Sequence, residues 1–206
     1  MNSESPKRPY RQGLRAAAAE MTGERILEAF RRALAERWFE EIRLDDVARE
    51  AKVTVQTVIR RFGGKEGLLA AAAERVGAEV RQRRRAPHGD LAAAVAALAL
   101  DYEASGDFVL RLLAQEERYP PIRVIADIGR KGHREWLESS FAGVLDAARP
   151  ALRRRRLDAL VAATDVYVWK LYRRDMKRSV AAYREAVEAL AAAALIWTPF
   201  NKGNEE

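Results

Sequence analysis

Residues 22–76 read TGERILEAFRRALAERWFEEIRLDDVAREAKVTVQTVIRRFGGKEGLLAAAAERV, and this stretch decides the fold of the 206-residue chain. Its apolar residues recur every three or four positions, which is the spacing of one face of a helix. The pattern predicts helices over 22–39, 44–51 and 54–62, and a fourth from residue 65 onward. Thr54 is a favourable N-cap for the third helix, and Gly63 and Gly64 end it. Two short helices joined by about three residues are the layout of a helix-turn-helix.

The third predicted helix carries the charge pattern of a nucleic-acid contact. From Lys52 through Lys65 the chain has four positive charges and no acidic residue, although it mixes both signs elsewhere. Val58 and Phe62 are expected to face the core. The outward positions are then Val55, Gln56, Thr57, Ile59, Arg60 and Arg61. Glutamine can pair with adenine, and arginine with guanine or phosphate, so this face suits the major groove of DNA.

The basic excess of the chain lies in its N-terminal part. The net charge is +7; residues 1–86 hold 19 basic and 13 acidic residues, or +6, and residues 87–206 hold 18 and 17, or +1. A proteome rich in arginine would explain the abundance of arginine but not this asymmetry. The N-terminal part is therefore the part that would attract a polyanion.

Composition excludes several classes of protein. With no cysteine and only two histidines, a disulfide framework and a thiolate metal site are excluded, and no metal or other cofactor is predicted. No apolar run approaches the roughly 20 residues of a membrane span, and residues 1–13 are polar and basic, so we expect a cytoplasmic protein without membrane contact. Abundant alanine, sparse glycine and proline, and helical spacing throughout favour an all-α fold.

Three parts are predicted along the chain. Residues 1–20 are expected to form a basic flexible arm, in which Lys7, Arg8, Arg11 and Arg15 lie among prolines and a glycine. The helix-turn-helix domain follows over 21–70, and a helical domain over 71–206 completes the chain, with a fourth helix over 65–86 as the connector. Helices in that last domain are predicted over 90–104, 107–118, 121–147, 150–176 and 180–197. The first break in this series is placed at Ser105-Gly106, and residues 129–132 are a further candidate break.

Over residues 22–69 the sequence resembles the DNA-binding domain of the tetracycline-repressor family. The resemblance is carried by Thr22 capping the first helix, Asp46-Val47-Ala48, Val53-Thr54, Phe62, Lys65-Glu66 and Leu68-Leu69. The sequence departs from the family pattern at Ile59, where an aromatic residue is usual, and at Gln56, where glycine is frequent. Isoleucine cannot donate a hydrogen bond to phosphate, so Ile59 either contacts a thymine methyl group or belongs to the core.

The resemblance implies a dimeric transcriptional regulator, by family habit a repressor that a small-molecule inducer releases from a palindromic operator. The implied partners are double-stranded operator DNA, a second copy of the chain and an unknown inducer. Carried over position by position, the residues at base edges and nearby phosphates are Thr54, Val55, Gln56, Thr57 and Arg60. In the same way Lys65 falls where the family contacts phosphate at a helix N-terminus.

The C-terminal part offers candidates for an interface and for an inducer pocket. Two apolar-faced segments end the chain, and either they form a dimer interface or both are internal core. The interface candidates are Leu160, Val168, Val187, Leu190, Ala194 and Leu195. The pocket candidates, for which core packing is the default reading, are Tyr102, Phe108, Trp136, Asp165 and Trp169. His133 has no partner at catalytic spacing and is expected at the surface.

Two other functional classes compete with a DNA-binding regulator. A helical enzyme with an accessory helix-turn-helix is disfavoured, because the sequence has no glycine-rich phosphate loop, no nucleophile elbow and no metal-ligand spacing. A basic protein that binds membranes or partners through residues 81–85 is the other alternative. Binding to lipid vesicles that survives loss of the 54–61 helix would favour that reading.

Overall fold

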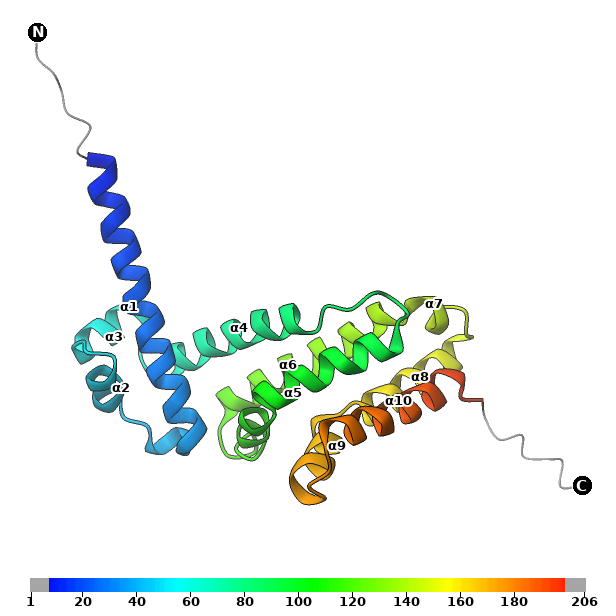
Figure 1. Cartoon of the computed structure of the whole chain (residues 1–206). Helices are drawn as coiled ribbons and strands as arrows, with labels where there is room; N and C mark the ends of the chain where they lie inside the picture. The colour runs from blue at the N-terminus through cyan, green and yellow to red at the C-terminus, as the bar shows by residue number, and fades with distance from the viewer. Residues whose placement is uncertain (1–7, 199–206) are drawn as a thin grey trace, which may run out of the picture. The chain divides into compact units, whose positions relative to one another are not determined.

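The computed structural model describes residues 8–198, and every regular element in that range is a helix (Figure 1). The prediction of an all-α fold is confirmed for these residues. Packing divides the chain into two compact units, Met1–Val76 and Gly77–Glu206. The boundary between the units falls inside α4 (Lys65–Arg83), so that α4 contributes to both.

Unit 1 contains the predicted helix-turn-helix. Before α4 its elements are α1 (Arg8–Glu36), the short 3-10 helix η1 (Phe39–Glu41), α2 (Leu44–Glu50) and α3 (Val55–Phe62). α1 packs on α2, and α2 on α3. The core between them is apolar and includes Phe30, Leu34, Val47, Val58 and Leu68. The predicted bounds of the second and third helices agree with the structure to within one residue.

The first helix begins much earlier than predicted. The expectation of a flexible arm over residues 1–20 and a helix capped by Thr22 is wrong for residues 8–20, because α1 is continuous from Arg8. Thr22 lies inside α1, where its hydroxyl donates a hydrogen bond to the carbonyl of Ala18 at 2.8 Å and does not act as a cap. The alanines over 16–19 are strong helix formers, and Pro9 is tolerated in a first turn. Lys7 lies outside the described residues.

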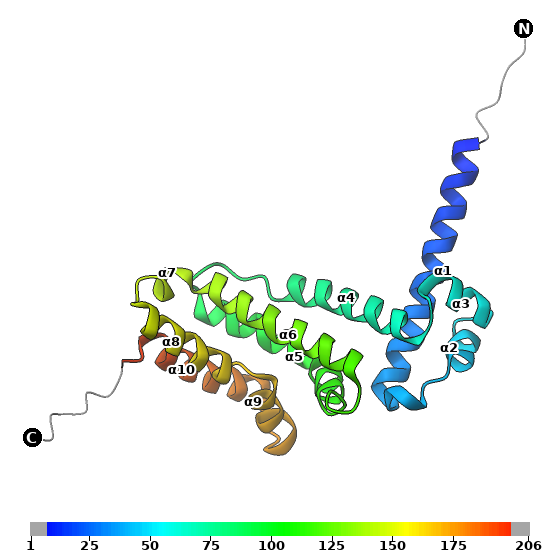
Figure 2. The same cartoon turned by 180° about the vertical axis from the view of Figure 1, so that it is seen from behind.

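Unit 2 begins with the end of α4 and is a bundle of helices. Its elements are α5 (Leu91–Leu113), α6 (Pro120–Ser140), α7 (Ala142–Leu145), α8 (Pro150–Ala163), α9 (Val166–Lys170), the π-helical turn η2 (Leu171–Asp175) and α10 (Val180–Ile196). α10 packs against both α8 and α5, and it runs beside α8 in both views (Figures 1 and 2). Pro120 and Pro150 begin α6 and α8, where proline fits because the first N–H groups of a helix have no partner within it.

Two predicted helix breaks are wrong. Ser105 and Gly106 lie within α5, where Ser105 Oγ donates to the Asp101 carbonyl at 2.8 Å and so satisfies its hydroxyl within the helix. Gly106 is buried, and a Cβ there would come within 2.5 Å of the Trp169 ring, so this glycine allows close packing and is not a turn. Residues 129–132 are likewise helical, and α6 ends instead at Ser140.

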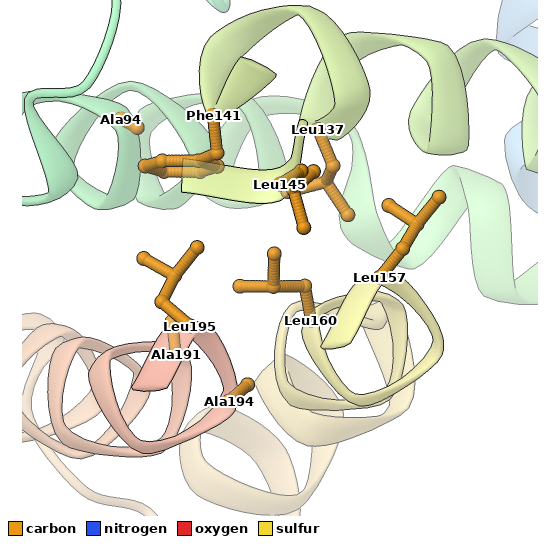
Figure 3. Packing of buried hydrophobic residues seen from close by; sticks show 9 residues of the cluster. All are labelled: Ala94, Leu137, Phe141, Leu145, Leu157, Leu160, Ala191, Ala194 and Leu195. Atoms are coloured by element: carbon orange, nitrogen blue, oxygen red, sulfur yellow. The ribbon is translucent and has the colours of Figure 1, made fainter. Parts of the chain in front are cut away.

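Several residues that were predicted to form a dimer interface lie in a core cluster of unit 2. Figure 3 shows Leu160 of α8 and Ala194 and Leu195 of α10 in one cluster with Leu137 and Leu145. Val187 is fully buried in a neighbouring cluster. The assignment of Leu160, Val187, Ala194 and Leu195 to a dimer interface is therefore corrected, because these side chains are already covered within the chain.

His133 is also not where it was expected. Instead of lying at the surface, it is partly buried, and its ring hydrogen-bonds Arg84 at 2.7 Å and Thr164 at 2.9 Å. Burial, together with the nearby Arg84 charge, lowers the pKa of His133 to about 3, so the ring is neutral. Across the described residues, no helix is both long and apolar enough to span a membrane.

Candidate DNA-binding surface

The turn between α2 and α3 is built by backbone geometry and by one side-chain cap. Lys52 adopts a left-handed conformation with φ of 55°, and the Val53 N–H then donates to the Ala48 carbonyl at 2.9 Å. Thr54 begins α3 by accepting a hydrogen bond from the Thr57 N–H at 3.2 Å, as its N-cap role requires. The prediction that Thr54 caps the third helix is confirmed.

α3 has a sharply divided inner and outer face. Val58 is fully buried in the core of unit 1, whereas Gln56, Arg60 and Arg61 are exposed. Gly63 ends the helix with φ of 77°, a left-handed conformation that glycine adopts without strain, and its N–H donates to the Ile59 carbonyl at 2.8 Å. The helix is therefore short and rigidly bounded, and it presents polar and basic side chains on one side.

The structure places the remaining predicted contact residues around this face. Ile59 is 41% exposed, so it belongs to the outer face and not to the core. Val55 and Thr57 are partly exposed, and the hydroxyls of Thr54 and Thr57 share a hydrogen bond of 2.9 Å. Whether any of these side chains contacts DNA stays a prediction.

A hollow of about 440 Å³ lies between α1 and α3, and it was not predicted. Its lining residues are Ala19, Thr22, Thr57, Arg60 and Arg61. Guanidinium and hydroxyl groups are the donors that commonly bind phosphate. Arg61 reaches the hollow beside Gly23, where a Cβ would come within 2.4 Å of its guanidinium, so a larger residue there would displace the Arg61 side chain from this position. Because Thr22 was predicted to cap the start of the first helix, nothing in the sequence indicated that it lines this hollow.

Lys65 is held by the protein itself. Its ammonium donates to the carbonyls of Phe39 at 2.5 Å, Ile42 at 3.0 Å and Glu40 at 3.2 Å, and it lies 4.5 Å from the centre of the Phe39 ring. Desolvation lowers the pKa of Lys65. Three donors meeting three carbonyls tie the start of α4 to η1. The role of Lys65 as a phosphate contact stays a prediction, and in this structure its N–H groups have other partners.

Replacing Lys65 with methionine is expected to destabilise unit 1 by about 1 to 3 kcal/mol, because three charge-assisted hydrogen bonds are lost while the aliphatic stem is kept. Thermal unfolding followed by circular dichroism measures this effect. Lys52→Met, at an exposed lysine, is the matched control and should change little. If Lys65→Met leaves stability intact but lowers the salt dependence of DNA binding by about one unit of slope, the lysine is a phosphate contact instead.

Asp46 joins the helices that carry the surface. Its carboxylate accepts hydrogen bonds from Arg49 at 2.9 Å and from Arg37 at 3.1 Å, which link the end of α1 to α2. These bonds to Arg49 and Arg37 lower the pKa of Asp46. Asp46 therefore supports the orientation of α2, on which α3 rests.

The predicted inducer-pocket residues lie in unit 2, and most of them have partners there. Tyr102 is buried and donates to the Thr164 carbonyl at 3.0 Å, and Trp169 is fully buried with Nε1 donating to Glu103 at 2.7 Å. Trp136 Nε1 donates to the Arg84 carbonyl at 3.0 Å, and Asp165 caps α9. Phe108 is partly buried. These contacts fit core packing, and a ligand role stays a prediction.

Comparison with known proteins agrees with this geometry. Residues 26–72 match the model of a family described as bacterial regulatory proteins, tetR family. Comparison with curated proteins gives no match.

Solved structures of regulators share the fold. A putative TetR-family regulator from Rhodococcus sp. is 17% identical, with a TM-score of 0.68 over 85% of this chain and 99% of its own. A transcriptional regulator from Rhodococcus sp. Rha1 is 20% identical, with a TM-score of 0.64 over 86% and 99%. A TetR-family regulator from Streptomyces coelicolor is 18% identical, with a TM-score of 0.58 over 84% and 80%. At these identities the structures support the fold alone, and the family match rests on residues 26–72: this segment of the chain belongs to the tetR family of bacterial regulatory proteins.

Proposed function

We propose that this regulator is a repressor that binds an inverted-repeat operator as a homodimer in the cytoplasm and leaves it when a small molecule binds. The observation that carries the DNA-binding part is the outer face of α3, which is basic, free of acidic residues and rigidly capped at both ends. A two-fold dimer imposes two-fold symmetry on the site that it reads. The residues proposed to contact DNA remain Thr54, Val55, Gln56, Thr57, Ile59, Arg60, Arg61 and Lys65.

The first test identifies the operator and then separates base reading from general affinity. Genomic fragments enriched by the purified protein supply the preferred sequence. Gln56→Ala should cost about 1 to 3 kcal/mol on that sequence and little on random DNA, because a base contact discriminates between bases and a phosphate contact does not. Gln82→Ala, at an exposed glutamine of α4, is the control. Equal losses on both DNAs for Gln56→Ala would remove Gln56 from base reading.

The proposed interface now rests on the exposed side of α10. Leu190 is 48% exposed and Ile196 is 75% exposed, although both are apolar. Four alanines of the same helix are also exposed, at positions 181, 189, 192 and 193. Small residues on a helix allow a partner helix to approach closely, and an apolar helix face loses contact with water when such a partner covers it. Val168, partly buried in α9, stays a flanking candidate.

Charged substitutions on this side of α10 test the dimer. Ala189 and Ile196 are two helical turns apart on one side, so Ala189→Glu with Ile196→Glu should convert the protein to monomer and weaken operator binding at least tenfold. Sedimentation velocity at micromolar concentration measures the first effect and fluorescence anisotropy the second. Ala104→Glu, an exposed alanine of α5, is the control. A monomeric wild-type protein, or a double variant that remains dimeric, would contradict this interface.

Release by a small molecule requires a difference in affinity between two states of the protein. A ligand that binds both states equally shifts neither, however tightly it binds. The candidates for ligand contact remain Tyr102, Phe108, Trp136, Asp165 and Trp169. The gene beside the operator would suggest the chemical class of ligand to add in the binding assay.

A further inference from the structure

Unit 2 contains a buried polar network around the end of α4, which we call the Arg84 network. Its members are Arg83, Arg84, Asp101, His133 and Thr164. The Asp101 side chain is 1% exposed, and its two oxygens accept from Arg83 Nε at 2.8 Å and from Arg84 Nε at 2.7 Å. Within α5, Asp101 lies close to buried apolar positions such as Leu98 and Tyr102.

The shared carboxylate restricts the rotation of α4. Arg83 is the last residue of α4, and Arg84 follows it with its N–H still bonded to the Val80 carbonyl at 2.9 Å, so the two side chains leave the helix end in different directions, about 100° apart in ideal helical geometry. One carboxylate can bind both Nε atoms only when the helix end has one rotational setting and one position along its axis. The Arg84 guanidinium also lies over two rings, 5.1 Å from the centre of Tyr102 and 5.3 Å from that of Trp136. Residues of both α5 and α6 therefore contact it.

His133 extends the network in one defined direction. Arginine can only donate, so His133 Nδ1 accepts from Arg84 Nη1, and the ring proton is on Nε2. Nε2 then donates to Thr164 Oγ1, which donates to the Leu160 carbonyl at 2.7 Å. The chain of donors links the end of α4 to α6 and then to the end of α8. A neutral histidine is suited to this position because a second positive charge beside Arg84 would be repelled.

A buried polar network of this kind adds little to the stability of the fold, but it fixes the orientation of the helices that it joins. Buried ion pairs lose about as much by desolvation as they gain by attraction, and well-packed apolar residues often replace them without loss. Their directional bonds, however, are satisfied in a single geometry. The Arg84 network therefore specifies the position of the C-terminal end of α4 in unit 2. From this end α4 continues without a break back to Lys65 in unit 1.

We propose that the residues of the Arg84 network are positioning residues for DNA binding: by fixing the rotation of the α4 end, they determine the operator spacing that the protein accepts. α4 is continuous across the unit boundary, so a rotation or shift at its end is passed to Leu68 and Leu69, which pack in the core of unit 1. The last step, from helix setting to operator spacing, rests on the proposed function.

The first experiment needs no DNA. The chain has no cysteine, so Ala35→Cys in α1 and Ala92→Cys in α5 give two unique sites for spin labels, both at exposed positions. Double electron–electron resonance, with excess unlabelled protein to isolate single chains, measures the distance distribution between the two units. The otherwise unaltered protein should give one narrow distribution.

Two variants remove the network in different ways. Arg84→Met with Asp101→Leu replaces the ion pair by apolar side chains, and His133→Leu removes the neutral ring while leaving the ion pair. Both should at least double the width of the distribution or displace its maximum. The matched control is Arg174→Met with Asp107→Leu, an exposed pair of unit 2 with Nη2–Oδ2 at 2.7 Å, and it should leave the distribution unchanged. If the double variant does not fold, Asp101→Asn takes its place, because the amide keeps the shape of the side chain but cannot accept from both arginines.

Three results overturn the proposal: a broad distribution in the otherwise unaltered protein, an unchanged distribution in a folded network variant, or equal broadening in the control. A second experiment then measures affinity for operators whose half-sites are moved apart by one base pair. The unaltered protein should lose at least tenfold more affinity than His133→Leu. Failure of all DNA binding would contradict the proposed function and leave the spin-label result standing, so the two failures are distinguishable.

Discussion

Replacing Asp101 with alanine is expected to lower the free energy of unfolding by about 3 to 5 kcal/mol, because two arginines lose at once the buried carboxylate that they share. Arg84 is 9% exposed and cannot reach solvent without leaving the Tyr102 and Trp136 rings. Its charge would then remain in the core without compensation. Urea unfolding followed by circular dichroism measures the loss, and urea avoids the ionic screening that guanidinium adds.

An exposed aspartate provides the comparison for Asp101. Asp127 forms an ion pair with Arg130 at 2.7 Å, but its side chain is 64% exposed. Because such pairs contribute little in water, Asp127→Ala should cost less than about 1 kcal/mol. A similar small loss for Asp101→Ala would mean that the Arg84 network is not desolvated in solution.

Truncating Trp169 to alanine is expected to cost about 3 to 5 kcal/mol, the range for a large aromatic side chain removed from a core. The ring is fully buried, Nε1 donates to Glu103, and the Arg174 guanidinium lies 4.4 Å from the ring centre. The change therefore leaves a cavity and also removes a partner from Glu103. The midpoint of urea unfolding should fall accordingly, and a loss below about 1 kcal/mol would contradict this account of the α5–α9 contact.

Gly106 tests the same contact from the other side. An added Cβ would lie 2.5 to 2.7 Å from three atoms of the Trp169 ring, which its polar partners hold in place. Gly106→Ala should therefore destabilise by about 1 to 3 kcal/mol. Gly129→Ala in α6, where a Cβ meets open space, should instead stabilise by about 0.5 to 1 kcal/mol. In the Trp169→Ala background the Gly106→Ala cost should largely disappear, since the clashing ring is gone.

Local chemistry allowed the DNA-binding helix to be predicted from the sequence. Thr54 and Gly63 act on backbone groups within three or four residues of themselves, so the ends of α3 follow from residue type and spacing. The exposure of Gln56 and Arg60 follows from the helical period once Val58 is placed in the core. The prediction failed at Thr22, because a hydroxyl that can cap a helix can also bond the carbonyl four residues back, as it does here.

The predicted interface shows the opposite case. An apolar stripe in the sequence indicates that a helix face is buried, but it does not indicate whether the same chain or a second copy of it covers that face. Val187 and Leu195 are covered within the chain, while Ile196, the next residue after Leu195, is exposed. That division depends on where α8 and α5 lie around α10, and residues distant in sequence decide it.

The sequence by itself thus determined the class of the protein, the helix-turn-helix and the basic face of α3, because caps, periodicity and charge act over a few neighbouring residues. Only the tertiary structure decided that Gly106 makes room for Trp169, that Lys65 is held by the carbonyls of η1 and of Ile42 after it, and that Arg84 joins Asp101 to His133. Each of these contacts brings together residues 17 to 63 positions apart. Such contacts form only when helices pack, and no local propensity encodes them.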